Sequence, residues 1–180
     1  GDIRSVDATF TKLTSGDLRE LDAAQDGGSL AELASYPLLA IVKLLGEEQT
    51  EFRTTSFRPE GVGVDLYSRI DFRYPHAVAS ARAGLGVKAE GDLIIGGTKG
   101  YLYVPAPWWK TEYFEVRFEN QSDNKKYYYK FDGDGLRYEI AEFSSMIRRG
   151  ERETFRLRAS ESRWLARVIE AGRADAHVFG

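Results

Sequence analysis

The sequence of 180 residues contains no cysteine, only two histidines and one methionine, and almost no excess of either charge. Without cysteine it can form no disulfide, no thiol nucleophile and no Cys-ligated zinc or iron–sulfur site, which fits a cytoplasmic protein. The 25 basic and 28 acidic residues give a net charge of -3 and are mixed along the chain. We therefore expect binding neither to nucleic acid nor to an anionic membrane surface.

Long apolar runs are also missing. The longest, from residue 38 to 45, is interrupted by Lys43 and is too short to span a bilayer. The amino terminus lacks the charged-then-apolar pattern of a signal peptide. His76 and His177 stand far apart without the carboxylate pairing of a metal site, so we expect no bound metal.

The residues that are present describe one domain of strands with helices near its start and its end. With 42% hydrophobic residues, the chain can bury one sizeable core, which we assign to residues 1–172, followed by a frayed tail over 173–180. Alternating patterns predict strands over 3–11, 52–57, 64–74, 77–88, 93–95, 101–104, 114–118 and 127–131. Helical spacing predicts helices over 29–45, 136–149 and 161–172, the last with a Ser160 cap.

Strands in uninterrupted succession favour an antiparallel sheet, and helices gathered before and after it favour an α+β class. We expect a large, mostly antiparallel open sheet with helices packed on one face. The other face of the sheet is either an interface or exposed to solvent. Its tyrosine-rich and threonine-rich strands would allow a homodimer through sheet packing, but a solvated face is the alternative.

The segment from Asp26 to Pro37 is the most informative part of the chain. Two glycines open a helix on which Glu32 and Tyr36 are four residues apart, so both side chains lie on one face and can reach one small space. Pro37 removes an amide donor and is expected to kink the helix beside Tyr36. The simpler alternatives are a first-turn carboxylate favoured by the helix dipole and an amphipathic core tyrosine.

Several short motifs, in this order, resemble the C-terminal domain of the Gfo/Idh/MocA oxidoreductases. The run from Gly27 to Glu32 is similar to the family's Gly-Gly-Gly-x-Leu-x-Asp helix start, and the turn Gly97-Thr98-Lys99-Gly100 matches a turn of that domain. Residues 135–139, leading to Ile147-Arg148-Arg149-Gly150, look most like the dihydrodiol and xylose dehydrogenase branch. The resemblance implies a domain that supplies the substrate pocket and the dimer contact.

The resemblance also implies a chemistry. In the family, the residue matching Tyr36 works with the lysine of a Glu-Lys-Pro motif to move the proton of the substrate oxygen, while a nicotinamide carries hydride. This chain has neither Glu-Lys-Pro nor the Gly-x-Gly-x-x-Gly turn of a dinucleotide-binding domain, and it begins at Gly1 without an initiator methionine. We therefore expect half of an enzyme, without its Rossmann domain and inactive alone. NAD or NADP would be bound mainly by the missing half.

The expected substrate is a sugar, polyol or cyclic diol. Glu32 and Tyr36 are the expected catalytic residues, and Trp108, Trp109 and Phe131 match positions where the dihydrodiol branch has aromatic pocket walls. The alternative for the tryptophans is a strand edge or a dimer contact. Lys99 in the glycine turn is expected to be solvated.

Two departures from the family pattern bear on substrate choice and on activity itself. Glu32 stands where the family has aspartate, which moves the carboxylate outward, and Ala34 stands where it has glycine. Three functions therefore remain open. They are the substrate domain of an NAD(P)-dependent dehydrogenase, a carbohydrate-binding module without redox chemistry, and a domain whose only role is dimerisation.

Overall fold

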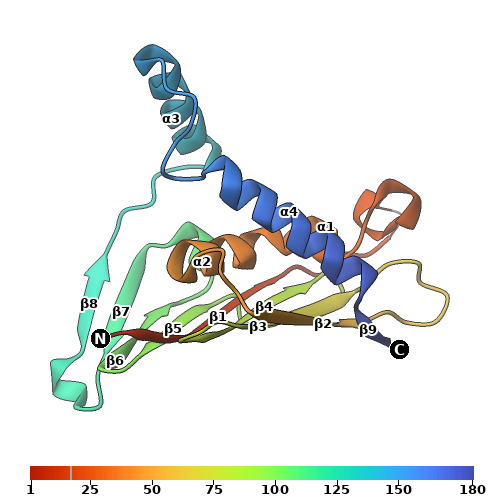
Figure 1. Ribbon diagram of the computed structural model, residues 1–180, viewed down its shortest axis with the longest axis horizontal. Coiled ribbons are helices and arrows are strands. Elements are labelled where there is room, and N and C mark those ends of the chain that lie inside the picture. Colours follow the sequence, from red (N-terminus) through yellow and green to blue (C-terminus); the bar gives the residue numbers. More distant parts are fainter. Residues whose placement is uncertain (17) are drawn as a thin grey trace.

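A nine-stranded sheet forms the body of the molecule (Figure 1). The computed structural model describes residues 1–16 and 18–180; Asp17, in the polar segment before the first helix, lies outside the described residues. The strands are β1 (Ile3–Thr11), β2 (Glu51–Phe57), β3 (Tyr67–Arg73), β4 (Val78–Gly84), β5 (Leu93–Gly97), β6 (Gly100–Val104), β7 (Tyr113–Arg117), β8 (Lys125–Tyr128) and β9 (His177–Phe179). Their order across the sheet is β8-β7-β6-β5-β1-β4-β3-β2-β9.

Only two of the neighbouring strand pairs are parallel. β1 pairs with β4 in parallel, and the short β9 adds to β2 in the same way, whereas all other described pairs are antiparallel. The expected α+β class with a large, mostly antiparallel open sheet is confirmed. The described residues contain no Rossmann fold.

Helices cover one face of this sheet (Figure 1). α1 (Ser29–Leu33) packs on β3 and β4, α2 (Ser35–Leu45) packs on β1 and β4, and α4 (Ala159–Ala174) packs on α1, α2 and β2. α3 (Leu136–Arg149) projects from the body instead, and none of its residues is buried. Short 3-10 helices, η1 (Arg19–Leu21), η2 (Ala23–Gln25), η3 (Trp108–Lys110) and η4 (Gln121–Asp123), lie in the connections.

The core lies between the helices and the sheet. Val6 and Ala8 of β1 face Leu38 and Ile41 of α2, and all four are completely buried. Trp164 of α4 is 2% exposed. Its ring stacks on Phe72 with 5.7 Å between centroids, and its indole N–H donates to Gln49 at 2.8 Å. The apolar stripes of α2 and α4 therefore meet the inner face of the strands, as their helical spacing predicts.

Several boundaries differ from the sequence-based expectation. The single helix expected over 29–45 is two helices, because the helix is interrupted at Ala34. The helix axis bends by 40° between Ala23–Leu33 and Ser35–Leu45. The strands expected over 64–74 and 77–88 are shorter, at Tyr67–Arg73 and Val78–Gly84.

The carboxyl end of the chain also differs. The expected Ser160 cap is wrong, since Arg158 is the N-cap of α4 and its backbone N–H bonds the Glu161 carboxylate. The tail expected to fray from Arg173 continues α4 to Ala174 and then forms β9 against β2. An unpaired edge of β2 favours such an added strand, because it leaves backbone groups without partners.

Among the described residues, no single helix is long and apolar enough to cross a membrane. The bent pair formed by Ala23–Leu33 and Ser35–Leu45 has the required length and composition. Its large apolar side chains are buried against the sheet, notably Leu30, Leu38 and Ile41.

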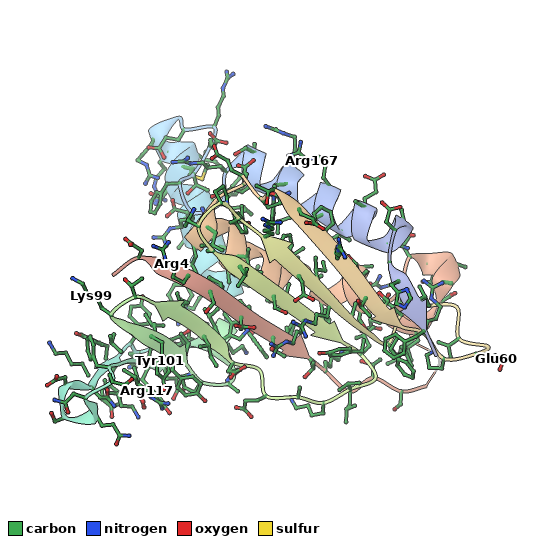
Figure 2. The ribbon with its side chains drawn as sticks, turned by 60° about the horizontal axis from the view of Figure 1, so that its bottom comes forward. Arg4, Glu60, Lys99, Tyr101, Arg117 and Arg167 are labelled. Atoms are coloured by element: carbon green, nitrogen blue, oxygen red, sulfur yellow. The ribbon has the colours of Figure 1, made fainter. Side chains whose placement is uncertain are left out.

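The open face of the sheet is turned forward in Figure 2. Toward β3 and β4 it carries ion pairs, among them Arg82 with Asp7 at 2.9 Å. Toward β6 and β7 it carries tyrosines, and Arg117 lies 4.6 Å from the Tyr103 ring centroid and donates to the Tyr101 hydroxyl at 3.3 Å (Figure 2). The face is therefore polar at one end and aromatic at the other.

An ion pair joins the two covering helices. Lys43 of α2 donates to both carboxylate oxygens of Glu161 at 2.8 and 2.7 Å. Burial alone would raise the pKa of Glu161, but the hydrogen bonds from Lys43 and from the Arg158 N–H outweigh it and hold the pKa below its usual value of 4.5. The ionised carboxylate therefore stabilises the folded state.

We expect this contribution to depend on pH. Because the folded-state pKa of Glu161 is lowered, its stabilisation is present above the unfolded-state pKa and is lost as pH falls through the folded-state value. The difference in unfolding free energy between the wild type and Glu161→Gln should shrink between about pH 6 and pH 3. Urea denaturation at several pH values measures it, and a difference independent of pH would contradict this account.

Candidate functional site

The helical segment that carries Glu32 on α1 and Tyr36 on α2 starts after Gly27 and Gly28, where an added Cβ atom would clash with neighbouring atoms. A Cβ at Gly27 would lie 2.6 Å from the Glu20 carbonyl oxygen and 2.8 Å from that of Arg19. Gly28 has φ +115, and a Cβ there would overlap Asp65 Oδ1. The first glycine thus lets η1 lie directly against the helix start, and the second makes room for Asp65.

Asp65 holds the first turn of α1. It is 6% exposed, and its Oδ2 accepts the Leu30 N–H at 3.0 Å and the Ser68 hydroxyl at 2.6 Å. Its backbone carbonyl accepts both the N–H and the hydroxyl of Ser29, at 2.9 and 3.0 Å. These bonds satisfy amide donors that a helix start leaves free. The sequence pattern assigned position 65 to the strand expected over 64–74 and did not single out Asp65, so its role at the helix start was missed.

The Glu32 side chain extends from α1 toward η1. Its Oε2 accepts a hydrogen bond from Arg19 Nη2 at 2.7 Å, with 16% of the Glu32 side chain and 55% of the Arg19 side chain exposed. The hydrogen bond and the charge of Glu32 raise the pKa of Arg19. Arg19 was not among the expected site residues. No spacing rule indicated it, because the contact depends on the close approach at Gly27.

Tyr36 is the second residue of α2, four residues after Glu32 and beyond the interruption at Ala34, and is 43% exposed. Its ring centroid is 4.4 Å from that of Phe10 on β1 and 6.5 Å from that of Trp109 on η3. Phe10 and Trp109 are themselves 4.0 Å apart, edge to face. The phenol therefore stands at the surface against an aromatic wall formed by Phe10 and Trp109. Phe10 is a further residue that the sequence did not single out for the site.

The two neighbouring tryptophans have different environments. Trp108 donates its indole N–H to the Thr9 carbonyl at 2.9 Å and its backbone N–H to the Gly91 carbonyl at 3.1 Å, which ties η3 to the sheet. Trp109 packs over Gly91, where a Cβ would lie 2.9 Å from its ring, and contacts Phe10. Trp109 is thus the one brought to Tyr36, while Trp108 anchors the loop.

Phe131 is placed in a different hollow. Its ring lies 5.5 Å from that of Tyr138, and it lines a cavity of about 360 Å³ together with Pro107, Lys110 and Tyr113. No described contact joins Phe131 to Tyr36 or Glu32. A larger cavity of about 610 Å³, between α1, β2 and α4, includes neither of these two residues.

The Gly27-Gly28 turn before α1 does not form a phosphate-binding site. Gly27 N–H donates to the Asp22 carbonyl at 3.0 Å, Gly28 N–H to the Glu20 carbonyl at 2.8 Å, and the next two amides bond Asp65. A dinucleotide-binding turn needs such amides to be directed at the pyrophosphate. The amides at this helix start therefore do not fit the pyrophosphate of a nicotinamide cofactor. They also contain no group of three or more metal-binding side chains.

No family model matches the chain. Its curated relatives include trans-1,2-dihydrobenzene-1,2-diol dehydrogenases from Oryctolagus cuniculus, 29% identical over 180 residues, and Homo sapiens, 28% identical over 178 residues. The alignments cover 96% of this chain but 54% and 53% of those enzymes. The chain is similar in sequence to the dihydrodiol dehydrogenases. It spans about half the length of the curated relatives it matches.

Solved oxidoreductases share the fold. KijD10, a 3-ketoreductase from Actinomadura kijaniata in complex with NADP and TDP-benzene, matches 99% of this chain and 55% of its own, with a TM-score of 0.83 and 20% identity. Aldose-aldose oxidoreductase from Caulobacter crescentus, complexed with glycerol, matches 97% of this chain and 53% of its own, with a TM-score of 0.79 and 18% identity. These matches confirm the fold that the resemblance to the C-terminal domain of Gfo/Idh/MocA oxidoreductases implies.

The requirement for glycine at position 28 can be tested on stability. We expect Gly28→Ala to cost about 1–3 kcal/mol more unfolding free energy than Gly46→Ala, because both residues have positive φ but only Gly28 faces another side chain. Urea denaturation of the two variants measures this difference. Equal losses would mean that backbone conformation alone requires the glycine.

Proposed function

We propose that this chain is the substrate-binding half of an NAD(P)-dependent dehydrogenase acting on a sugar, a polyol or a cyclic diol. The observation that carries the proposal is the exposed phenol of Tyr36 against the wall of Phe10 and Trp109, four residues after Glu32 in the chain. A flat apolar wall beside a few polar groups suits a ring that carries hydroxyls. The dihydrodiol dehydrogenases among its relatives support a substrate of this kind.

In this proposal, Tyr36 exchanges a proton with the oxygen of the reacting carbon. A phenol can both donate and accept a hydrogen bond, so it can remain bonded to that oxygen as alcohol or as carbonyl. Phe10 and Trp109 pack against the substrate ring and limit the positions it can take. Glu32 accepts a hydrogen bond from a substrate hydroxyl.

The nicotinamide is proposed on the strength of the neighbours, since KijD10 is described in complex with NADP. When bound, it supplies the acceptor or donor of hydride. The amides of the Gly27-Gly28 turn are already bonded within the chain, so we assign cofactor binding to a separate nucleotide-binding domain. We therefore expect the chain to show no dehydrogenase activity by itself.

We also propose a homodimer through the open sheet face. The aromatic end formed by Tyr101, Tyr103 and Tyr113 offers side chains that are enriched in protein interfaces. Arg117 and Lys126 lie over these rings, so the surface combines cations with aromatic faces.

The role of Tyr36 is tested in a protein that joins this chain to its nucleotide-binding domain. We expect Tyr36→Phe to lower kcat by about 10²–10⁴ while KM for the diol changes little, because the ring is kept and only the hydroxyl is lost. Steady-state assays over a sugar and diol panel measure both constants. Leu136→Ala, an exposed change on α3, is the control. An unchanged kcat would exclude Tyr36 from proton transfer.

The dimer is tested by sedimentation of the chain itself. We expect a species of twice the 20.3 kDa chain mass, and a monomer after Tyr103→Asp, since a buried unpaired carboxylate would oppose the interface. Tyr129→Asp is the matched control, because Tyr129 follows β8 outside the strand and is 62% exposed. A monomeric wild-type chain would contradict the proposed dimer.

A further inference from the structure

α3 presents large apolar side chains to solvent. Ile140, Phe143 and Ile147 are spaced by three and four residues, so they lie along one face of the helix. Their exposed fractions are 57%, 64% and 64%. None of the 14 residues of α3 is buried, and the helix projects from the body of the molecule (Figure 1). We call Ile140, Phe143 and Ile147 the α3 stripe.

The polar side chains of α3 make its described hydrogen bonds and ion pairs. Glu142 accepts a hydrogen bond from the Thr154 hydroxyl at 3.2 Å and pairs with Arg156 at 3.2 Å. In the first turn, the Tyr138 hydroxyl accepts the Asp132 N–H at 3.0 Å. A helix at the surface of a domain ordinarily turns its apolar face inward and leaves its charges in water. The reversed arrangement in α3 is typical of a helix that packs on a partner through an apolar face with this spacing.

α3 stands on the helix-covered side of the sheet. In Figure 1 it rises on the same side as α1, α2 and α4. Tyr36 belongs to α2 and contacts Phe10 under the helices, so the candidate site is on this side as well. The open face, for which we propose the homodimer, is the opposite one and is turned forward in Figure 2. A second copy bound through the open face therefore leaves the α3 stripe uncovered.

The start of α3 is also close to the aromatic wall. The cavity of about 360 Å³ that Phe131 lines is bounded by Pro107 and Lys110, the residues at the two ends of the η3 turn that carries Trp109. The Phe131 ring lies 5.5 Å from that of Tyr138 in the first turn of α3. A partner that packs along α3 is therefore beside the candidate site.

A nucleotide-binding domain fits this position. The matched part is 54% and 53% of the curated relatives, whose remaining residues suffice for a further domain. A nicotinamide that exchanges hydride with a carbon bound at Tyr36 has to be held on the helix-covered side of the sheet, where α3 stands. We propose that the α3 stripe is the docking surface for the nucleotide-binding domain and holds that domain over Tyr36. This inference rests on the proposed function, from which it takes the separate domain and the place of the reaction.

Hydrogen exchange of the backbone amides of residues 136–149 tests the docking. Mass spectrometry measures the exchange in this chain alone and in the protein that joins it to its nucleotide-binding domain. We expect exchange in the joined protein to be slower by about tenfold or more, because packing against a second domain suppresses the local opening of an exposed helix.

Two serine variants on α3 identify the docking face. Phe143→Ser should return exchange in the joined protein to the rate of the chain alone. Arg148→Ser is the matched control, because Arg148 is exposed on another side of the same helix and receives the same replacement. It should keep the slow exchange. Thermal unfolding of the chain alone should be the same for both variants, because neither side chain is buried there.

The outcomes distinguish this inference from the proposed function. Equal exchange in the chain alone and in the joined protein overturns the docking, and dehydrogenase activity in that joined protein leaves the proposed function intact. Slow exchange that survives Phe143→Ser overturns the role of the α3 stripe. Slow exchange in the chain alone that is lost on dilution shows a second copy on the stripe and overturns the inference as well. If the expected slowing is found but Tyr36→Phe leaves kcat unchanged, the proposed function fails while the docking stands.

Discussion

The buried carboxylate of Asp65 is the contact on which the candidate site depends. The carboxylate accepts hydrogen bonds from the Leu30 N–H and the Ser68 hydroxyl, and the Asp65 backbone carbonyl accepts one from the Ser29 hydroxyl. These bonds hold the loop before β3 and the start of α1 together. A buried carboxylate exchanges its hydrogen bonds to water for bonds to fixed donors of the protein. It therefore stabilises one conformation strongly, because any other conformation would leave the buried carboxylate without these donors. The direction of α1, and hence of Glu32, is determined there.

The site is assembled from segments distant in sequence, and each supplies a different property. β1 provides Phe10, η3 provides Trp109, α1 and α2 provide the carboxylate and the phenol, and η1 provides Arg19. Phe10 and Trp109 pack against one side of the Tyr36 ring, while Tyr36 remains 43% exposed and the Arg19 side chain 55% exposed. This combination of a rigid apolar wall and a few fixed polar groups is typical of small-molecule sites.

Periodicity predicted most of the architecture but not the contacts that refine it. The alternating strands and α3 at its observed bounds follow from local pattern. Arg19, Phe10 and Asp65 could not be predicted in the same way, because their roles depend on backbone approach at Gly27 and Gly28 and on pairing between distant strands. Trp108 and Phe131 show the same limit. Their aromatic character was evident, but local pattern did not give their surroundings.

The position of β1 in the middle of the sheet has a consequence for how the chain folds. β1 is the first strand in the sequence, yet both of its partners, β4 and β5, lie far along the chain, with Ser5 opposite Val78 and Ala8 opposite Leu93. Closing such long loops costs chain entropy before any contact compensates for it, and folding rates fall as contacts become less local. During synthesis, the contact between Phe10 and Trp109 therefore forms only after more than half of the chain has been made, so the candidate site is absent until then.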